Sequence, residues 1–327
     1  MAECLDLMTG GTTVMEGVVP TEASGQRLDK VLASLFPPYS RSQLQQWTKQ
    51  GRITICGRVP QGREPVLGGE QVRLEVPPVE PREWRAQALP LDVIHQDSDI
   101  LIIDKPAGTV VHPGAGNPDG TLANAIIHHY PDLAVLPRAG LVHRIDKDTS
   151  GLLVVARTEH ARVQLIRALE RHAVSRIYLA LVTGTPVAGG TVNAPIGRHP
   201  RDRLRMAVND RGKPAVTHYR VKTRFRSHTL LQVELETGRT HQIRVHMVHA
   251  GYPLVGDLLY AGRLKIPAAA SEVFAESLRQ FKRQALHACS LALLHPRTGL
   301  PMQWSSPVPG DMKALLRVLE IDRKADR

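Results

Sequence analysis

The sequence HRIDKDTS at residues 143–150 continues through Gly151 into the apolar run LLVVA at residues 152–156. The apolar run is typical of a buried β-strand, so the polar stretch places two carboxylates and three potential cations at the end of that strand. An ion close to a low-dielectric core must be paired, or its pKa shifts until the group is neutral. A carboxylate that an arginine keeps ionised at such a place is a candidate nucleophile.

The same stretch also fits an ordinary polar turn. Aspartate and serine side chains bond to their own backbone in turns, and glycine adopts a positive φ without steric cost. This short stretch leaves both interpretations open, so the choice depends on the rest of the chain.

Size and charge limit the class of protein. With 327 residues, of which 42% are hydrophobic, the chain is long enough for one large and one small domain. The formal net charge of +11 favours a polyanionic partner or simply a basic, soluble protein, and charge alone does not choose between them.

The compartment is indicated by the cysteines and by the N-terminus. Cys4, Cys56 and Cys289 are far apart and form no Cys-x-x-Cys pair, which supports neither a disulfide framework nor a cysteine zinc site. Residues 1–17 carry acidic but no basic side chains, unlike a secretory or transit signal, and we expect a flexible leader there. No uncharged apolar run approaches the length of a membrane span. We therefore expect a cytoplasmic protein, and nothing in the sequence requires more than a monomer.

Residues 18–80 have the pattern of a small α+β domain. Apolar residues at helical spacing predict a helix over 27–36, and Ser40 begins a second helix that ends at Gly51. Alternating apolar and polar residues at 53–55 and 72–76 then predict two strands.

This segment resembles an S4 domain, the small helix–helix–hairpin module that binds RNA. The resemblance makes Arg41 and Arg52 candidate RNA-binding residues. The alternative is that these cations belong to a solvated surface. A proline-rich stretch at 77–81 cannot continue a sheet, because proline lacks a backbone donor, and it marks a domain boundary.

We expect a linker at residues 81–90, a large domain at 91–320 and a charged tail at 321–327. Within the large domain, apolar or alternating stretches predict strands at 100–103, 152–156, 177–182, 216–225 and 230–236, and helical spacing predicts a helix at 159–171. This mixture indicates the α+β class, built around a mixed, mainly antiparallel sheet.

Four stretches together resemble the RluA-type pseudouridine synthase family. Residues 143–151 differ only at Ile145 from the family pattern His-Arg-Leu-Asp-Lys-Asp-Thr-Ser-Gly, and the substitution keeps the side-chain volume. The other three, in family order, are DKPAG at 104–108, RIYLA at 176–180 and GRTHQIRVH at 238–246. The matches cover nearly all of residues 90–310 and favour the catalytic interpretation over the turn.

The resemblance implies that the protein isomerises uridine in RNA, with Asp146 as the catalytic carboxylate. Asp148 is the rival, since it lies two residues away with the same chemistry, but it is expected to brace the loop. Tyr178 is expected to stack on uracil, although a tyrosine on an alternating strand is more often part of the core. No redox cofactor or metal is implied, because the reaction only relocates a bond.

Arg244 lies in a segment that predicts a helix, with Thr240 as its cap and Gly251 at its end. A buried arginine there needs an anion, and in the family the corresponding cation pairs with the catalytic aspartate. The alternative is an exposed helix arginine. In the family, the arginine that matches Arg144 enters the space left by the flipped base.

Further candidate contacts with RNA are cations and histidines of the matching stretches, namely His143, Lys147, Arg239 and His241. His143 is expected to brace its loop rather than act as a base. His241, His246 and His249 are spaced by five and three residues, which does not match a zinc motif, so we expect no metal. Between residues 198 and 213, seven basic side chains predict an arm that faces RNA, or else a solvated loop.

Within the family the chain is most similar to members that modify 23S rRNA in the stem-loop called helix 69. The expected partner is therefore 23S rRNA or a precursor of the large ribosomal subunit. Three alternatives stay open. The chain could be a sister synthase that modifies other uridines of the same rRNA, a non-catalytic RNA-binding factor in ribosome assembly, or a glycosidase-like hydrolase with a second carboxylate.

Overall fold

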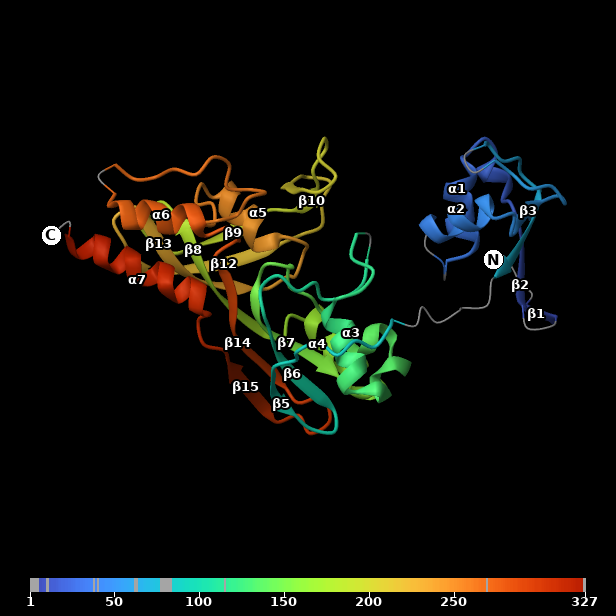
Figure 1. Ribbon diagram of the computed structural model, residues 1–327. Helices are drawn as coiled ribbons and strands as arrows, with labels where there is room; N and C mark the ends of the chain where they lie inside the picture. The colour runs from blue at the N-terminus through green and yellow to red at the C-terminus, as the bar shows by residue number, and fades with distance from the viewer. Residues whose placement is uncertain are drawn as a thin grey trace. The chain divides into compact units, whose positions relative to one another are not determined.

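A computed structural model describes residues 6–9, 12–37, 39, 41–61, 64–76, 84–114, 116–268 and 270–325. The chain divides into two compact units, Met1–Glu83 and Trp84–Arg327 (Figure 1). None of the helices in these stretches combines the length and the apolar character of a membrane span.

The small unit is a four-stranded antiparallel sheet that shares one core with two helices. Its strands have the order β1-β2-β4-β3. The elements are β1 (Asp6–Thr9), β2 (Thr12–Val18), η1 (Thr21–Ala23), α1 (Leu28–Leu35), α2 (Arg41–Lys49), β3 (Ile53–Ile55) and β4 (Gln71–Val76). The predicted helix–helix–hairpin order is confirmed from α1 to β4. Ser40, the expected cap of α2, lies outside the described residues.

The expected flexible leader at residues 1–17 is wrong where the structure describes it, because residues 6–9 form β1 and residues 12–17 belong to β2. Strand β2 pairs with β4 from Thr13 opposite Val76 to Val18 opposite Gln71. The sequence TTVMEGV is rich in β-branched residues, which favour a half-buried pleated strand over a tail. The absence of basic residues, which argued against a targeting signal, carries no information about sheet pairing.

The large unit is built on one twisted sheet. Its strands are β5 (Val93–Gln96), β6 (Ile100–Lys105), β7 (Ser150–Ala156), β8 (Ser175–Thr183), β9 (Gly190–Asn193), β12 (Val216–Arg224), β13 (His228–Leu235), β14 (Leu286–Leu294) and β15 (Pro301–Ser305). They follow the order β5-β6-β7-β14-β8-β13-β12-β9, with β15 beside β14. Within the described chain only the pair β7–β14 is parallel, so the predicted mixed, mainly antiparallel sheet is confirmed.

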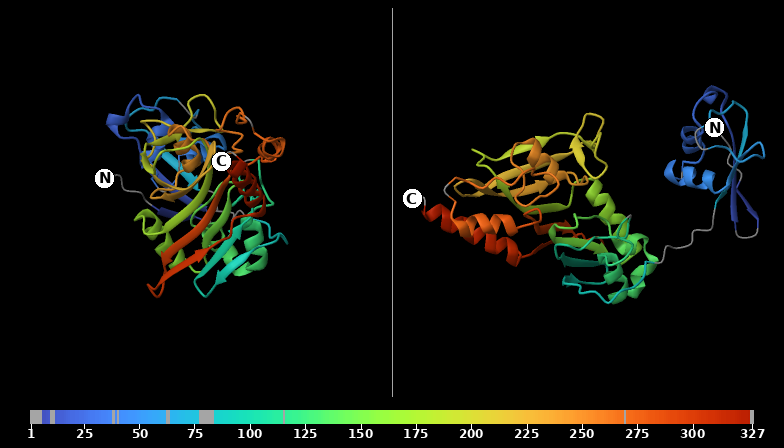
Figure 2. Two further views of the ribbon diagram at one scale, coloured as in Figure 1. Left: turned by 90° about the vertical axis from the view of Figure 1, so that its left-hand side faces the viewer. Right: turned by 45° about the horizontal axis from the view of Figure 1, so that its top comes forward.

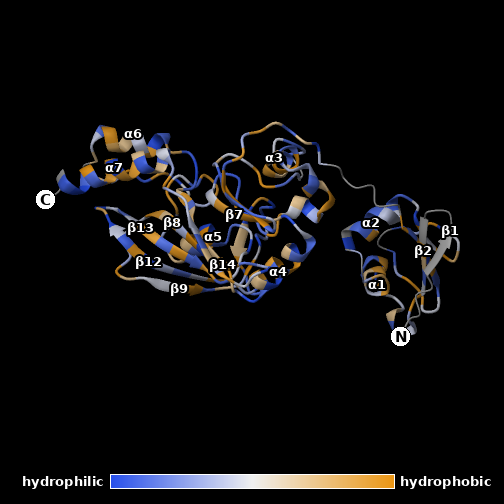
Figure 3. Ribbon diagram, turned by 90° about the horizontal axis from the view of Figure 1, so that it is seen from below, coloured by the Kyte–Doolittle hydropathy of each residue, from blue (hydrophilic) through white to orange (hydrophobic). Residues whose placement is uncertain are grey.

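Helices cover both faces of this sheet (Figures 1 and 2). The helices are α3 (Leu122–His129), α4 (Glu159–Glu170), α5 (Gln242–His249), α6 (Glu272–Gln280) and α7 (Gly310–Ala325), with short 3-10 turns η2 (Pro131–Val135) and η3 (Pro137–Gly140). Alternate residues of β8 separate the two faces. Ala180 packs in the core that includes α3 and α5, whereas Leu181 packs under α6 and α7. Both α6 and α7 show mixed blue and orange bands in Figure 3, as amphipathic helices do.

Two expected boundaries of the large unit are wrong. Trp84 and Leu91 pack against its core, and Asn124 Nδ2 donates to the carbonyl of Arg85 at 2.7 Å, so the second half of the expected linker belongs to the large unit. The expected tail from residue 321 is helical through Ala325, because α7 continues past it. Residues 77–83, including most of the proline-rich stretch, lie outside the described residues.

Gly151 allows the close approach of β7 to β14. Its φ is +115°, and a Cβ atom there would lie 2.3 Å from the carbonyl oxygen of Ala288. Since real Cβ atoms do not come so close to backbone, a side chain at this position would push the strands apart. The glycine expected in a turn therefore lies inside the sheet, and it fixes the start of β7 directly after the loop at residues 143–149.

Candidate active site

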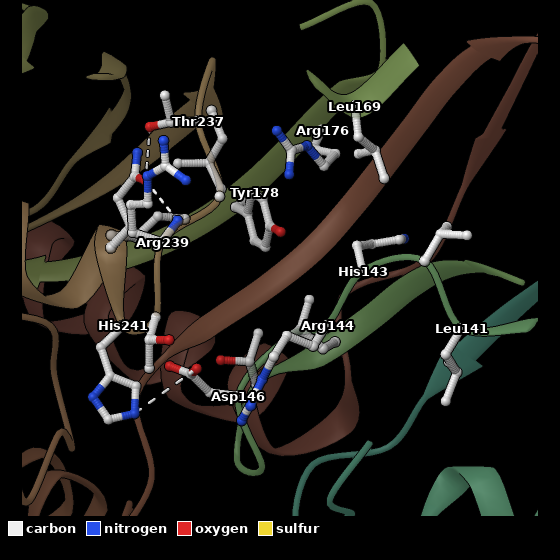
Figure 4. A pocket seen from close by; sticks show the side chains of 18 of the residues that line it. Leu141, His143, Arg144, Asp146, Leu169, Arg176, Tyr178, Thr237, Arg239 and His241 are labelled. Carbon is white, nitrogen blue, oxygen red and sulfur yellow. Dashed lines mark hydrogen bonds and ion pairs between the residues drawn. The ribbon is translucent and has the colours of Figure 1, made fainter. Parts of the chain in front are cut away.

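A cavity of about 530 Å³ lies beside the end of β7. Four segments supply most of its wall, namely the loop at residues 141–149, strand β8, the end of α4 with His172, and residues 235–244 at the start of α5 (Figure 4). Three of the four stretches that carry the family resemblance thus meet at one place, although they are far apart in the sequence.

The centre of the site is a guanidinium between two carboxylates. Arg244 Nη1 donates to Asp146 Oδ2 at 3.2 Å, while its Nε and Nη2 donate to Asp257 at 2.7 and 2.8 Å. The side chain of Arg244 is 8% exposed, that of Asp257 1% and that of Asp146 16%. Burial lowers the pKa of Arg244, but the carboxylates outweigh it and raise the pKa overall. Arg244 is therefore permanently charged, and Asp146 is the more accessible of its two partners.

Two aromatic groups complete the surroundings of this pair. The ring of Tyr260 lies 4.8 Å from Arg244 Cζ, a cation–π contact. Its hydroxyl accepts the backbone N–H of Met206 at 2.8 Å and lies 2.8 Å from His241 Nδ1. Burial lowers the pKa of His241 in spite of Asp146, so a neutral ring is favoured. If Tyr260 donates to Nδ1, the N–H of His241 is at Nε2, which lies 4.0 Å from Asp146.

Helix α5 begins differently from the prediction. Thr240 does not cap it. The N-cap is His241, which has a φ of 57°, and the side chain of Gln242 accepts the N–H of Arg239 at 2.9 Å and the hydroxyl of Thr237 at 2.8 Å. In the part of the chain that the structure describes, no side chain caps α5, and Gln242 instead ties the preceding residues 237 and 239 to the first turn of the helix. This turn brings His241 and Arg244 to the same side, facing Asp146.

Tyr178 lies in the wall of the cavity. It is on β8, 5% exposed, and Figure 4 draws its ring between Arg176 and Asp146. Burial raises the pKa of Tyr178, so its phenol keeps its proton at neutral pH and can donate a hydrogen bond.

His143 holds the loop rather than facing a substrate. Its Nε2 accepts the backbone N–H of Val154 at 3.0 Å, and burial lowers its pKa to about 3. A neutral ring with its proton on Nδ1 follows. The expectation of a bracing histidine therefore agrees with its contacts, and this leaves only Nδ1 to meet RNA.

A buried lysine, Lys105, holds the backbone of the loop at Lys147, on the other side of Asp146 from His143. Lys105 Nζ donates to the carbonyls of Pro106 at 2.7 Å and Lys147 at 2.9 Å. Burial lowers its pKa to about 7, although Asp148 and Asp146 favour the charged form. Lys105 thus fixes the backbone one residue after Asp146.

The remaining predicted contacts with RNA are divided between the two units. Arg144 is exposed and lines the cavity. Arg239 also lines the cavity but is only half-exposed, and its Nε donates to the carbonyl of Pro214 at 3.0 Å. Lys147 is exposed but does not line the cavity. In the small unit, Arg41 pairs with the buried Asp29 at 2.6 Å, so its guanidinium has a structural role there.

Arg52 is half-buried, and its guanidinium forms no ion pair within the described residues. The expected basic arm contains a hairpin of β10 (Ile196–Arg198) and β11 (Met206–Val208). Exposed arginines lie between its strands, at positions 201 and 203.

Metal-binding groups are not gathered at the cavity in the described part of the chain. Both ring nitrogens of His246 are bonded, to Thr217 Oγ1 at 2.8 Å and to the carbonyl of Ala194 at 2.9 Å, so it is a core histidine. The group that metal-ligand spacing picks out is Asp97, Asp99 and His295. Its most buried carboxylate, Asp99, already accepts two bonds from Arg297, which lowers its pKa without any ion.

Three residues of the site were missed by sequence reasoning. Asp257 could have been found, because a buried arginine needs an anion and Asp257 is the only acidic residue between Glu236 and Glu272. Lys105 lies in the stretch DKPAG that carries part of the family resemblance, but the stretch alone assigns it no role, and Tyr260 carries no comparable signal. Their roles depend on contacts with the loop and with α5 that only the folded chain creates.

The chain was compared with known proteins. A family model described as RNA pseudouridylate synthase matches residues 99–249. The chain is 55% identical to the ribosomal large subunit pseudouridine synthase D of Pseudomonas aeruginosa over 307 residues, covering 94% of this chain and 96% of the relative. It is 53% identical to the protein of that name from Escherichia coli over 299 residues, covering 91% and 92%. Among solved structures, human RNA pseudouridylate synthase domain containing 4 has a TM-score of 0.55 at 25% identity, covering 70% of this chain and 93% of that one.

The buried ion pair makes a first prediction. Asp257→Asn leaves Arg244 without its bidentate partner, so we expect the free energy of unfolding in urea to fall by about 3 kcal/mol. Asp311→Asn is the matched control. Asp311 binds Arg283 with the same two-bond geometry, at 2.6 and 2.8 Å, but is 48% exposed, so its loss should cost under about 1 kcal/mol. Equal losses for the two variants would contradict the weight given to the buried pair.

Lys105 makes a second prediction, on pH. Its pKa is about 7 in the folded chain against an ordinary 10.5, so between these values the unfolded chain binds more protons. This group therefore makes the wild-type free energy of unfolding rise with pH in that window. The Lys105→Met variant lacks this titrating amine. The free energy of unfolding of the wild type minus that of the variant should therefore increase from pH 7 to pH 10 and stay constant below pH 6. Stability curves of Lys105→Met and the wild type that run parallel from pH 6 to pH 10 would refute the lowered pKa.

Proposed function

The chain belongs to the RNA pseudouridylate synthase family, and from this premise we propose that it converts uridine to pseudouridine in the RNA of the large ribosomal subunit, with Asp146 as the catalytic carboxylate. The observation that carries the proposal is the position of Asp146, which lies at the cavity and is paired with a buried arginine that cannot lose its charge.

The reaction cleaves the C1′–N1 bond, turns the uracil and rejoins it through C5. When C1′–N1 breaks, its electron pair leaves with N1, and the ribose becomes electron-poor. A carboxylate at the sugar either takes up C1′ as an ester or removes a ribose proton. Asp146 suits both routes, since its Oδ2 is held by Arg244 while Oδ1 lies near His241 and the cavity.

Arg244 positions Asp146. Two of its hydrogen-bonding nitrogens are used by Asp257, which fixes the plane of the guanidinium, and Nη1 remains for Asp146. A fixed donor needs no reorganisation when charge moves during the reaction. Tyr178 offers a flat face for the uracil and a protonated hydroxyl that can assist proton movement at C5.

RNA binding is assigned to the exposed basic groups around the cavity. Arg144 lies in the wall of the cavity, and we assign to it the role of occupying the stack after the target base flips out. The hairpin of β10 and β11 presents arginines that can neutralise phosphates. Residues 1–83 form a separate compact unit with its own core, and we assign RNA binding to it as an S4-like module.

The substrate is inferred from the relatives. Several proteins above 50% identity, over more than 90% of this chain, carry the name ribosomal large subunit pseudouridine synthase D. We therefore assign 23S rRNA, free or in a precursor of the large subunit, as the substrate, and helix 69 stays the predicted location of the target uridines. The cytoplasm, where that RNA is made, is the proposed compartment.

The alternatives make different demands on the cavity. A glycosidase-like hydrolase needs a second carboxylate, but Asp148 does not line the cavity, and within the described residues the other carboxylate in its wall is Glu170 at the exposed end of α4. A non-catalytic binding factor has no need of a carboxylate, which repels phosphates, at the centre of its RNA site.

The central prediction concerns Asp146. Asp146→Asn keeps the shape but removes the charge, so release of tritium from 23S rRNA labelled at uracil C5 should fall by at least about 10⁴-fold. Affinity for the rRNA should change by less than about 3-fold, because the carboxylate makes no favourable contact with phosphate. Asp148→Asn is the matched control and should keep most of the wild-type rate.

Substantial turnover by Asp146→Asn, or loss of turnover only in Asp148→Asn, would contradict the assignment of Asp146 as the catalytic carboxylate. Free uracil among the products would favour the hydrolase. Tight binding without tritium release by the wild type, on free rRNA and on large subunits, would favour the assembly factor.

The division of labour between the units makes a further prediction. A chain of residues 84–327 should bind 23S rRNA more weakly, by about 10-fold or more, because it loses a set of phosphate contacts. It should still release tritium from a short stem-loop at high concentration, since all residues of the cavity lie in the large unit. Failure to act on the stem-loop, by a chain whose circular dichroism is native, would refute this division.

A further inference from the structure

Arg176 is a second buried arginine in the cavity wall, and its surroundings differ from those of Arg244. It lies on β8, two residues before Tyr178, so both side chains are on the same face of the sheet. Its side chain is 8% exposed and lines the cavity.

The guanidinium of Arg176 has almost no partner of its own. Its Nη2 makes one long hydrogen bond, of 3.4 Å, to the carbonyl of Glu236, and its Nε is buried without an acceptor. Within the described residues no carboxylate lies within ion-pair distance of it, whereas Arg244 has two. A buried cation with unused donors is costly, which points to an acceptor supplied by a ligand.

Gly238 leaves room for this group. A Cβ atom at Gly238 would lie 2.8 Å from Arg176 Nη1, although the backbone of Gly238 does not have a positive φ. The loop that begins α5 therefore packs directly against the guanidinium and confines it. A glycine at this position therefore provides room for the guanidinium, and it is not needed for an unusual backbone conformation.

The order of groups along the cavity limits what the ligand can be. Figure 4 draws Arg176 on the far side of Tyr178 from Asp146, and the charges of both residues affect the pKa of Tyr178. The RNA backbone continues on both sides of the target nucleotide, so its phosphates must stay at the mouth. A flipped base alone reaches groups that are as buried as Tyr178 and Arg176, and with C1′ at Asp146 its distal edge points toward Arg176.

We propose that Arg176 donates a hydrogen bond to a carbonyl oxygen of the target uracil, O2 or O4, and stabilises the negative charge of the detached base. The proposal rests on the proposed function, because it takes the ribose to lie at Asp146. When C1′–N1 breaks, the bonding pair moves to N1 and spreads over O2 and O4, while Asp146 supplies a pair to C1′ or removes a ribose proton. Joining C1′ to C5 then uses an electron pair of the base, while the ester pair returns to Asp146 or, in the other route, the ribose proton is given back. C5 loses its proton and N1 gains one, so no oxidant or reductant takes part.

Such a contact is stronger in the transition state than in the bound substrate, because the oxygen gains charge as the bond breaks. Arg176→Met should therefore lower kcat by about 10²-fold, with the Kd for 23S rRNA within about 2-fold of wild type. Since the variant removes an unpaired buried charge, its thermal unfolding midpoint should be unchanged or higher. Gly238→Ala, which displaces the guanidinium without removing it, should lower kcat by less.

Substrates altered by one atom identify the acceptor. A stem-loop with 2-thiouridine or 4-thiouridine at the target replaces one oxygen by a poorer acceptor, so one of the two should slow the wild type by about 10-fold and Arg176→Met hardly at all. A methylphosphonate beside the target tests the rival acceptor, a phosphate. If it weakens wild-type binding but not that of Arg176→Met, Arg176 holds phosphate and the proposal is wrong.

The matched control is Arg317→Met, which removes an exposed arginine of α7 and should behave as wild type. A lower melting point together with weaker RNA binding in Arg176→Met would show a structural role and overturn the inference. So would a wild-type rate in that variant while Asp146→Asn is inactive, and this outcome leaves the proposed function standing. If the wild type itself releases no tritium, the proposed function fails first.

Discussion

The ion pairs of Arg244 are the interaction on which the rest of the active site depends. Asp257 lies under Arg244 with two short hydrogen bonds and almost no exposure, and Asp146 approaches from the loop at 3.2 Å. Removing three charges from water is costly, and the arrangement repays the cost only when all three are present with good geometry. Helix α5, the segment around Asp257 and the loop of Asp146 are thus required to fold together. The same condition fixes the position of Asp146 at the edge of the core.

A second constraint is the fixed backbone of the loop that carries Asp146. Lys105 and Gly108 both bond to the carbonyl of Lys147, and His143 receives the N–H of Val154. Gly151 then allows β7 to approach β14 closely enough for parallel pairing. Because these contacts act on both sides of Asp146, the carboxylate has little freedom to turn away from the cavity. Catalysis by a single side chain benefits from such rigidity, since misplacement of a reacting group is expensive.

Two arginines in one cavity show two different uses of the same side chain. Arg244 has its donors occupied by protein carboxylates, so it organises the site before RNA arrives. Arg176 keeps donors unused beside Tyr178, and we propose that the substrate uses them. One arginine thus holds the carboxylate of Asp146 in position, and we propose that the other offers positive charge to the leaving base. Electrostatic preorganisation of this type avoids the need for water to reorient during the reaction.

The fold class could be predicted from the sequence because it depends on local periodicity. The apolar runs at 100–103, 152–156 and 177–182 became β6, β7 and β8, and the helical spacing at 159–171 became α4. The strand β14 was not predicted, although it is central, because its sequence mixes buried apolar residues with His287 and Ser290. The cap of α5 was assigned to Thr240, the usual residue type, whereas the N-cap is His241 and no side chain of the described residues caps the helix.

The sequence by itself determined which side chains are the candidates for the chemistry, since the stretches around Asp146, Tyr178 and Arg244 are recognisable as linear motifs. Only the tertiary structure decided their partners. Asp257 lies 13 residues beyond Arg244, and Lys105 lies 42 residues before Lys147. The state of Arg176, buried with unused donors, is likewise invisible in the sequence, because burial and hydrogen bonding depend on which segments pack together. Charge states and cavity shape follow from the removal of water, and water is removed only when the sheet, the loop and α5 come together.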